Sequence, residues 1–276
     1  MVGFMIISIS DLVIEINLIY EKEFKTLDDY KSNSNPSFFI NSSFDEFDLE
    51  LKEPFMETEF YDKFKVGSKV IQRQKNQSGK VYAYIEYDGN TINIYNDKNN
   101  NFYDEYLLSQ YAIFDLVCNN TDSILFHSST IKYNDIGIAF SAKSGTGKST
   151  HRRLWQKYGN CIPINDDKNI ITLKNDKLYI TPNPWCGKHF VENNINSTLD
   201  VIIFLFQSKE NIIKNISKAQ AFKLLLGQIV VPNDSNKDKW NRIIDKILEL
   251  PILYYGCNME YEAFSTIRER IDEIVK

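Results

Sequence analysis

The sequence contains few of the residues that build metal centres or disulfide frameworks. Of its 276 residues, three are histidine and four are cysteine. The four cysteines, Cys118, Cys161, Cys186 and Cys257, form no C-x-x-C pair, and no Cys/His cluster has the spacing of a zinc site. We therefore expect reduced thiols in a cytoplasmic protein.

Long apolar runs and an excess of positive charge are also missing. No apolar run approaches the length of a membrane span, and residues 1–18 lack the basic start and small-residue cleavage site of a signal peptide. The formal net charge is −5, while hydrophobic residues make up 43% and charged residues 25% of the chain. This composition is typical of soluble globular proteins and predicts neither a nucleic-acid nor a membrane partner.

Residues 140–150 have the pattern of a phosphate-binding loop between a strand and a helix. The pattern predicts a short apolar strand at 137–140 and a helix from about Ser149 to Tyr158, with Gly159 at its C-cap. Backbone N–H groups of such a loop cradle phosphates, and the helix N-terminus adds a favourable dipole. Ala142 occupies the first glycine position, which alanine can take where φ is negative. The alternative is a Gly/Ser-rich turn that happens to contain lysine.

The loop supplies the candidate nucleotide ligands. Gly145 and Gly147 allow the backbone to wrap closely around phosphates. Lys148 would reach the β- and γ-phosphates, and Ser149 would place its hydroxyl on a metal ion. ATP and Mg²⁺ are therefore the predicted cofactors. The predicted nucleotide-binding residues are Ser144, Gly145, Thr146, Gly147, Lys148, Ser149 and Thr150.

Two adjacent carboxylates, Asp166 and Asp167, follow the next predicted strand, one helix downstream of the loop. One carboxylate at such a place can hold Mg²⁺ beside the phosphates. The other can orient an acceptor hydroxyl or take its proton. We predict that Asp166 is the base and Asp167 the metal ligand, and an exchange of these roles stays open. The alternative is an Asx turn that opens the next hairpin.

Residues 182–189 form a proline-containing loop with a cation and an aromatic ring. Its functional interpretation is a loop that contacts the acceptor or a phosphate, with Lys188 neutralising the transferred charge. The alternative is a proline-fixed connection with a buried Trp185. Cys186 has no identifiable base, so we expect a buried, inert thiol there.

The hydrophobic pattern predicts a chain of two parts. Residues 1–100 are expected to be a β-rich N-terminal region, and residues 101–276 a P-loop core with C-terminal helices. The predicted strands lie at 4–8, 12–18, 81–87, 91–95, 123–127, 131–133, 170–173, 178–181, 200–206 and 252–255, and the predicted helices at 104–117, 238–250, 260–275 and from Ser217 through Ile229. The run at 200–206 is typical of a strand buried on both faces.

Four tyrosines gather on the predicted hairpin at 81–95. Tyr82, Tyr84, Tyr87 and Tyr95 could form a stacking platform for bases. A half-exposed sheet face also uses amphipathic tyrosine, and without a basic groove we prefer that interpretation.

Residues 127–129 (His-Ser-Ser), the loop at 144–150 and Asn165-Asp166-Asp167 together resemble the catalytic core of HPr kinase/phosphorylase. They also resemble related kinases found with ribosomally made peptides, and phosphoenolpyruvate carboxykinase has a similar loop and Asp pair. The resemblance covers about residues 125–206. It implies an α/β (α+β) fold with a mixed β-sheet in the P-loop core, and ATP-dependent phosphoryl transfer to a serine hydroxyl of a protein or peptide.

The resemblance also assigns residues to roles. Lys148 and Ser149 match the nucleotide-binding positions, and Asp166 and Asp167 match the base and metal carboxylates. His127 matches a histidine near the active centre, which makes it a catalytic candidate. Its alternative is a hydrogen-bonded core histidine at a strand end.

Other functions compete with a peptide or protein kinase. A small-molecule kinase with a hydroxyl-bearing substrate fits the same motifs. A carboxykinase-like enzyme would need an arginine-rich pocket, but the six arginines are scattered and none lies in the Trp185 loop. A nucleotide-binding regulator without chemistry would not need the Asp pair. The oligomeric state, a homo-oligomer included, stays open.

Overall fold

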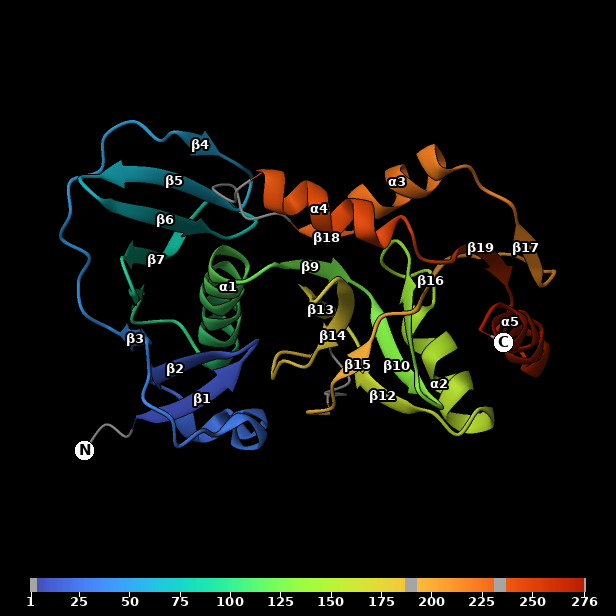
Figure 1. The fold of residues 1–276 in the computed structure, drawn as a ribbon. Coiled ribbons are helices and arrows are strands. Elements are labelled where there is room, and N and C mark those ends of the chain that lie inside the picture. The colour runs from blue at the N-terminus through green and yellow to red at the C-terminus, as the bar shows by residue number, and fades with distance from the viewer. Residues whose placement is uncertain (1–3, 187–192, 231–236, 276) are drawn as a thin grey trace. The chain divides into compact units, whose positions relative to one another are not determined.

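The computed structural model describes residues 4–186, 193–230 and 237–275 (Figure 1). The chain divides into two compact units, Met1–Leu116 and Val117–Lys276. This division falls inside helix α1 (Phe102–Asn120), whereas the sequence prediction placed the boundary at about residue 100. The predicted fold class, a mixed α/β chain with a β-rich N-terminal region, is confirmed.

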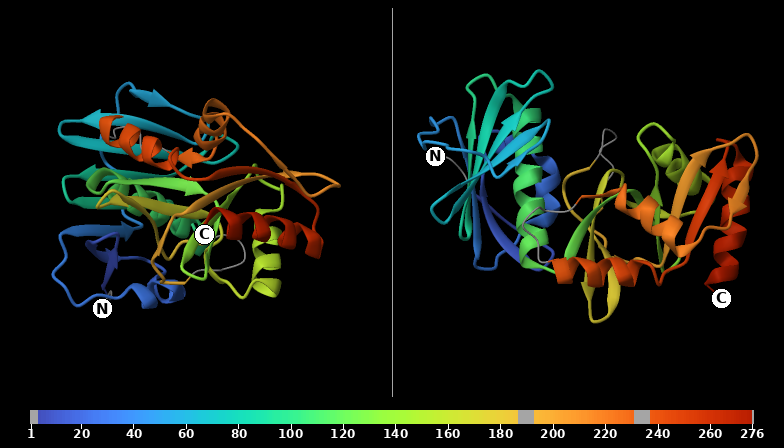
Figure 2. Two further views of the ribbon diagram at one scale, coloured as in Figure 1. Left: turned by 45° about the vertical axis from the view of Figure 1, so that its right-hand side comes forward. Right: turned by 90° about the horizontal axis from the view of Figure 1, so that it is seen from above.

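Unit 1 has one sheet of eight strands among its described residues, in the order β1-β2-β3-β8-β7-β6-β5-β4. Strand β3 is parallel to β2 and β8, and the other neighbours are antiparallel. Helix α1 lies along one face of this sheet (Figure 2). The strands are β1 (Met5–Ile9), β2 (Leu12–Asn17), β3 (Phe38–Ser43), β4 (Met56–Glu57), β5 (Tyr61–Val66), β6 (Lys69–Lys75), β7 (Val81–Asp88) and β8 (Thr91–Asn96), and two short 3-10 helices are η1 (Glu21–Glu23) and η2 (Lys25–Tyr30).

The predicted hairpin of unit 1 is present as β7 and β8. Gly89 sits in its turn with φ of +57°, a left-handed conformation that glycine adopts without strain. Side chains alternate across the sheet, so Ile85 is buried and Tyr87 bonds Asp115 of α1 on the same face. Tyr84 points to the opposite face and pairs across the strands with Tyr95.

Strands β3 to β6 were not predicted, and two of them, β5 and β6, bury polar side chains. Asp62 in β5 is buried and accepts from Arg73 Nη2 and Lys75 Nζ of β6, both at 2.7 Å. Gln72 and Gln74 of β6 are buried as well. Long-range pairing therefore overrides a sequence pattern that does not alternate between apolar and polar residues.

Unit 2 contains two sheets within its described residues. One has six strands in the order β12-β10-β11-β16-β19-β17, in which β11, β16 and β19 are mutually parallel and the outer pairs antiparallel. The other has five antiparallel strands in the order β15-β14-β13-β9-β18. The strands are β9 (Ser123–His127), β10 (Ser129–Tyr133), β11 (Ile136–Ser141), β12 (Ile162–Asn165), β13 (Lys168–Lys174), β14 (Lys177–Thr181), β15 (Ser197–Thr198), β16 (Val201–Gln207), β17 (Ile212–Lys214), β18 (Ile229–Val230) and β19 (Ile252–Cys257).

Strand β16 forms the centre of unit 2. Val201, Ile203 and Leu205 pack in a core with helices α2 (Lys148–Tyr158) and α5 (Tyr261–Ile274). Ile202 and Phe204 face the other way, into a core with the five-stranded sheet and helices α3 (Lys218–Leu226) and α4 (Lys237–Ile247). The prediction of a strand buried on both faces is confirmed.

The prediction that helix α3 extends through Ile229 is wrong. The predicted capping box of Ser217 and Gln220 is present, but the helix ends at Leu226, before Gly227. Ile229 instead pairs with Phe126 as part of β18. None of the helices in the described ranges is long and apolar enough to span a membrane.

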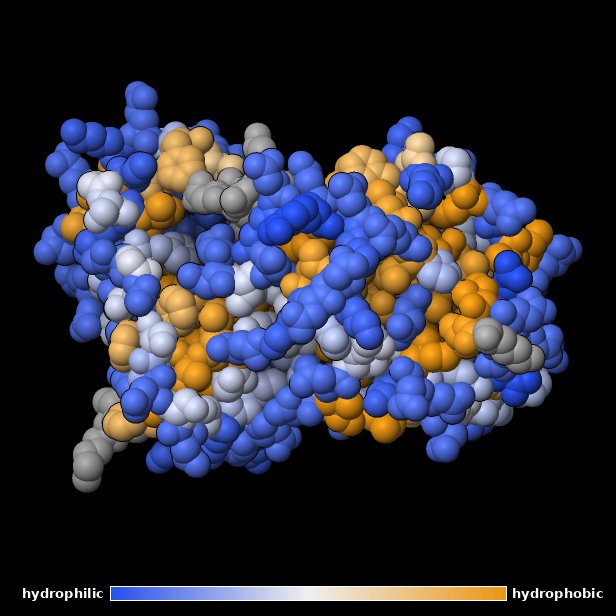
Figure 3. Space-filling view, viewed as in Figure 1, coloured by the Kyte–Doolittle hydropathy of each residue, from blue (hydrophilic) through white to orange (hydrophobic). Residues whose placement is uncertain are grey.

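Hydrophobic and hydrophilic side chains are interspersed on the face shown in Figure 3. Among the exposed large hydrophobic residues are Phe55 and Phe60, each about half exposed. Scattered apolar exposure of this kind is normal for folded proteins, so surface hydropathy alone does not locate a functional site.

Candidate active site

The loop predicted to bind phosphate connects β11 to α2 at the carboxyl ends of the parallel strands. That edge of a parallel sheet is where ligands bind in open α/β folds. Gly145 and Gly147 have φ of +78° and +112°, a region that favours glycine. Ala142 is not among the described residues with positive φ, so alanine fits the first glycine position. Helix α2 begins directly at Lys148, and its first turn leaves backbone N–H groups without intrahelical acceptors.

Lys148 is buried and spans the loop. Its ammonium donates a hydrogen bond to the carbonyl oxygen of Ala142 at 3.1 Å, from the last part of the loop to the first. Burial lowers the pKa of Lys148, although the neighbouring carboxylates of Asp167 and Asp166 act in the opposite direction. An anionic ligand would stabilise the charged form of this buried ammonium, because the ligand would replace the solvation that burial removes.

Asp166 has a buried ion pair. Arg152 Nε donates to its Oδ1 at 3.0 Å, and the exposed fractions of the two side chains are 2% and 1%. The hydroxyl of Ser129 also donates to Oδ1 of Asp166. Asp166 thereby joins the end of β12 to β10 and to α2. Its role as a base stays a prediction, and these contacts give it a structural task.

Asp167 and His127 lie in the same neighbourhood as Lys148. His127 Nε2 is 3.5 Å from Asp167 Oδ1, and about a third of each side chain is exposed. Burial lowers the pKa of His127, and the charge of Lys148 lowers it further. The carboxylate of Asp167 and the hydrogen bond from His127 to Gln228 act in the opposite direction. The imidazole is therefore neutral at pH 7.

The hydrogen bonds of His127 favour one tautomer. Nδ1 lies 3.1 Å from the amide oxygen of Gln228, which can only accept, so Nδ1 carries the proton. Nε2 then presents a lone pair towards Asp167 Oδ1. These two hydrogen-bond acceptors lie 3.5 Å apart. The hydroxyl group of a substrate that receives the phosphate could donate a hydrogen bond to either of them.

The backbone holds His127 in place. Ser141 Oγ donates to the His127 carbonyl oxygen at 2.8 Å, and the His127 N–H donates to the carbonyl of Gln228 at 2.8 Å. His127 also pairs with Lys168, the residue after the Asp pair. Strand β9 is thus attached to the start of the phosphate loop and to the Asp pair.

The Trp185 loop is anchored next to the Asp pair. Asn165 Nδ2 donates to the carbonyl oxygen of Trp185 at 3.0 Å, and the Trp185 N–H donates to Asn183 Oδ1 at 3.1 Å. Trp185 and Cys186 are buried. Lys188, the predicted charge-neutralising residue, lies outside the described residues.

A cavity of about 660 Å³ adjoins the loop. Residues 142–146 form one wall, and the rings of Phe206 and Tyr254, with centroids 4.5 Å apart, belong to the other. Lys223 and Gln228 also line it. Since Gln228 bonds His127, the cavity reaches the residue that holds the imidazole.

The described residues contain no group of three or more His, Cys, Asp or Glu side chains that could hold a metal ion by itself. Mg²⁺ prefers oxygen ligands and is usually held by one or two protein groups together with substrate phosphates. The half-buried Ser149 hydroxyl and the Asp167 carboxylate are donors of that kind. The residues present therefore fit a nucleotide-associated Mg²⁺.

Three residues of this site were given no individual role from the sequence: Ser129, Arg152 and Gln228. Arg152 stands four positions after Lys148, on the same face of α2 one turn later, and that spacing could have marked it. Gln228 is about a hundred residues from His127 in the chain, and no local pattern distinguishes it.

No protein-family profile matches the chain, and no curated protein matches it in sequence. Among solved structures, the HPr(Ser) kinase/phosphatase from Coxiella burnetii matches with a TM-score of 0.32 and 10% sequence identity. The match covers 55% of this chain and 99% of that chain. A likeness this distant does not establish a common family or activity.

Proposed function

We propose that unit 2 binds ATP with Mg²⁺ and transfers the γ-phosphoryl group to a serine hydroxyl of a peptide or protein. The observation that carries the proposal is the position of Lys148. It bonds the carbonyl oxygen of Ala142 at the start of the phosphate loop. The preceding residue, Ser141, bonds the carbonyl oxygen of His127, and His127 Nε2 lies 3.5 Å from Asp167 Oδ1. Loop, carboxylate and neutral imidazole therefore belong to one site.

The loop residues would bind the phosphates. Gly145 and Gly147 permit the backbone to wrap around them, and Lys148 would exchange its bond to Ala142 for phosphate oxygens. Ser149 and Asp167 would hold Mg²⁺, which would offset the phosphate charge. The neighbouring cavity has room for the rest of the nucleotide or for part of the acceptor.

His127 and Asp167 would act on the acceptor hydroxyl. The acceptor oxygen forms a bond to the γ-phosphorus while the bond to the β–γ bridging oxygen breaks, which releases ADP. The hydroxyl proton passes to His127 Nε2, and Asp167 stabilises the imidazolium. Phosphoryl transfer depends mainly on positioning and charge stabilisation, so this proton transfer supports rather than dominates catalysis.

Asp166 would hold the neighbouring Asp167 in position. Its bonds to Arg152 and Ser129 fix the strand end from which Asp167 projects. The acceptor class depends on the resemblance of residues 127–129, the phosphate loop and the Asp pair to HPr kinase motifs. A serine hydroxyl is a suitable donor for either of the two adjacent proton acceptors, His127 Nε2 and Asp167 Oδ1.

The test is incubation of the full chain with γ-labelled ATP, Mg²⁺ and a library of serine-containing peptides, followed by mass spectrometry. We expect phosphoserine with the wild type and none with Lys148→Ala. The proposal would be overturned if a folded Lys148→Ala variant still transferred phosphate. It would also be overturned if the wild type produced neither ADP nor phosphopeptide.

A further inference from the structure

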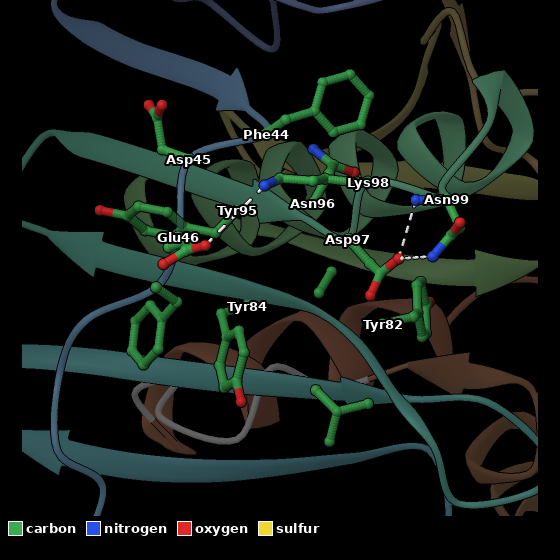
Figure 4. A pocket seen from close by; sticks show the side chains of 13 residues that line it. Phe44, Asp45, Glu46, Tyr82, Tyr84, Tyr95, Asn96, Asp97, Lys98 and Asn99 are labelled. Atoms are coloured by element: carbon green, nitrogen blue, oxygen red, sulfur yellow. Dashed lines mark hydrogen bonds and ion pairs between the residues drawn. The ribbon is translucent and has the colours of Figure 1, made fainter.

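Unit 1 has a cavity of its own, far along the chain from the phosphate loop. It has a volume of about 500 Å³ and lies over the first residues of β7 and the end of β8. The segment at 44–47, which follows β3, forms its other side (Figure 4). All of its lining residues belong to unit 1, so it is separate from the site described above.

Aromatic rings form the walls of this cavity. The Phe47 ring stacks on Tyr84, with centroids 4.1 Å apart and planes within 7° of each other. Phe47 also meets the edge of Tyr95 at 5.4 Å. Tyr84 and Tyr95 are a cross-strand pair on the sheet face away from Tyr87 and Asp115, and Phe44 and Tyr82 also line the cavity. Ring faces carry partial negative charge and attract cations.

The polar groups of the cavity are mainly negative. Asp45, Glu46 and Asp97 contribute carboxylates, while Lys98 is the one cation among the lining residues that the structure describes. Lys98 lies 4.0 Å from Glu46, and both are largely exposed, so this pair is weak and replaceable. Hydrogen bonds from the backbone and side chain of Asn99 lower the pKa of Asp97 and keep it ionised.

The negative charge continues beyond the cavity. Residues 47–54 contain three exposed carboxylates, Asp48, Glu50 and Glu53, and one lysine, Lys52. A partner on this surface would therefore have to be positively charged. Arginine combines a permanent charge with a planar group that stacks on aromatic rings and bonds carboxylates in pairs.

We propose that this cavity binds arginine side chains of a basic peptide segment. The guanidinium would pack on the ring surface that the Phe47–Tyr84 stack leaves open and bond a lining carboxylate such as Glu46, while the acidic residues after Phe47 attract the flanking positive charges. Binding requires no nucleotide and no phosphoryl transfer, so it is independent of the function proposed for unit 2.

The experiment is a calorimetric titration of the full chain, without ATP or Mg²⁺. The probe is a short glycine/alanine peptide that carries arginines, and the control peptide has glutamine in their place. The pocket variants are Phe47→Leu, which removes a ring, and Glu46→Gln, which removes an exposed charge without disturbing packing. The matched controls are Tyr103→Leu on α1 and Asp135→Asn in unit 2, both exposed and outside the cavity.

We expect the arginine peptide to bind at least about fivefold more tightly than the glutamine peptide, in line with a partly desolvated cation–π contact. Each pocket variant should lose at least about threefold in affinity. Tyr103→Leu, Asp135→Asn and Lys148→Ala should bind as the wild type does. Absence of binding, equal binding of both peptides, or equal losses in the control variants would overturn the proposal, whatever the kinase assay shows.

Discussion

Arg152 and Asp166 form a buried ion pair that attaches the helix after the phosphate loop to the strand end before Asp167. The Nε–H of Arg152 donates to Asp166 Oδ1 at 3.0 Å, and neither side chain is more than 2% exposed. Lys148 and Arg152 stand one turn apart on α2, so one helix face supplies both the phosphate-loop cation and the partner of the Asp pair. This relationship gives Asp166 a structural contact to α2.

The first prediction concerns Asp166. Asp166→Asn should lower the free energy of unfolding by about 3–5 kcal/mol, because it leaves Arg152 buried without its counter-charge. Urea unfolding measures the loss, and Asp135→Asn on an exposed turn is the matched control with little expected change. A variant of unchanged stability that transfers phosphate slowly would instead support the original prediction that Asp166 is the base.

The second prediction concerns His127. His127→Gln should slow single-turnover transfer by about 10²–10⁴-fold, the usual contribution of a general base. The affinity for MgATP should change little, because Lys148 and the loop remain. Asp167→Asn, measured beside it, should weaken nucleotide-linked Mg²⁺ binding as well as the rate. If His127→Gln reacts at the wild-type rate, the imidazole is not the proton acceptor.

The third prediction concerns the loop conformation. Gly147→Ala should reduce MgATP binding, because φ of +112° is strained for alanine and its Cβ would meet the Met259 side chain. Such backbone strain costs about 1–3 kcal/mol. Gly67→Ala, in a unit 1 turn with φ of +62° and open space around it, also places alanine at positive φ, away from the loop. Equal MgATP affinities of the two variants would contradict this role of Gly147.

The fourth prediction concerns acid stability. His151 is fully buried, accepts a hydrogen bond from Trp155 Nε1, and has a pKa lowered to about 3 by burial. The unfolded chain, with a histidine pKa of 6.5, binds a proton that the folded chain does not bind. Stability is therefore undiminished above pH 6.5 and falls by about 1.4 kcal/mol for each pH unit below it.

His151→Gln removes that titration. Between pH 6.5 and pH 5, we expect the wild type to lose ~2 kcal/mol more than His151→Gln, measured as free energies of unfolding in urea. Parallel pH profiles for the two proteins would show that His151 does not cause the acid sensitivity.

The sequence predicted the parts of the fold that have local signals. The hairpin at β7 and β8 follows from Asp88-Gly89, and β16 from its uninterrupted apolar run. Strands β5 and β6 were missed because Asp62 is buried through partners, Arg73 and Lys75, that only the fold brings near. Ile229 was assigned to a helix because its spacing suits one, yet its pairing with Phe126 makes it a strand residue.

The candidate site was partly predictable for the same reason. The phosphate loop and the Asp pair are contiguous motifs, and the structure brings Lys148, His127 and Asp167 into one neighbourhood. The buried contacts of Asp166 were not predictable, since they come from Arg152 and Ser129 on two other elements. Gln228, which selects the tautomer of His127, is likewise visible only in the fold.

The measurement that tests the central claim most directly is a calorimetric titration of MgATP into the wild type, Lys148→Ala and Lys157→Ala. Lys157 is an exposed lysine in the last turn of α2, outside the cavity beside the loop, and serves as the matched control. A hydrogen bond to a charged group contributes about 1.5–3 kcal/mol, so Lys148→Ala should bind MgATP at least about tenfold more weakly than the wild type. Lys157→Ala should bind nearly as the wild type does. Equal MgATP affinities of the wild type and a folded Lys148→Ala protein would contradict a nucleotide site at this loop.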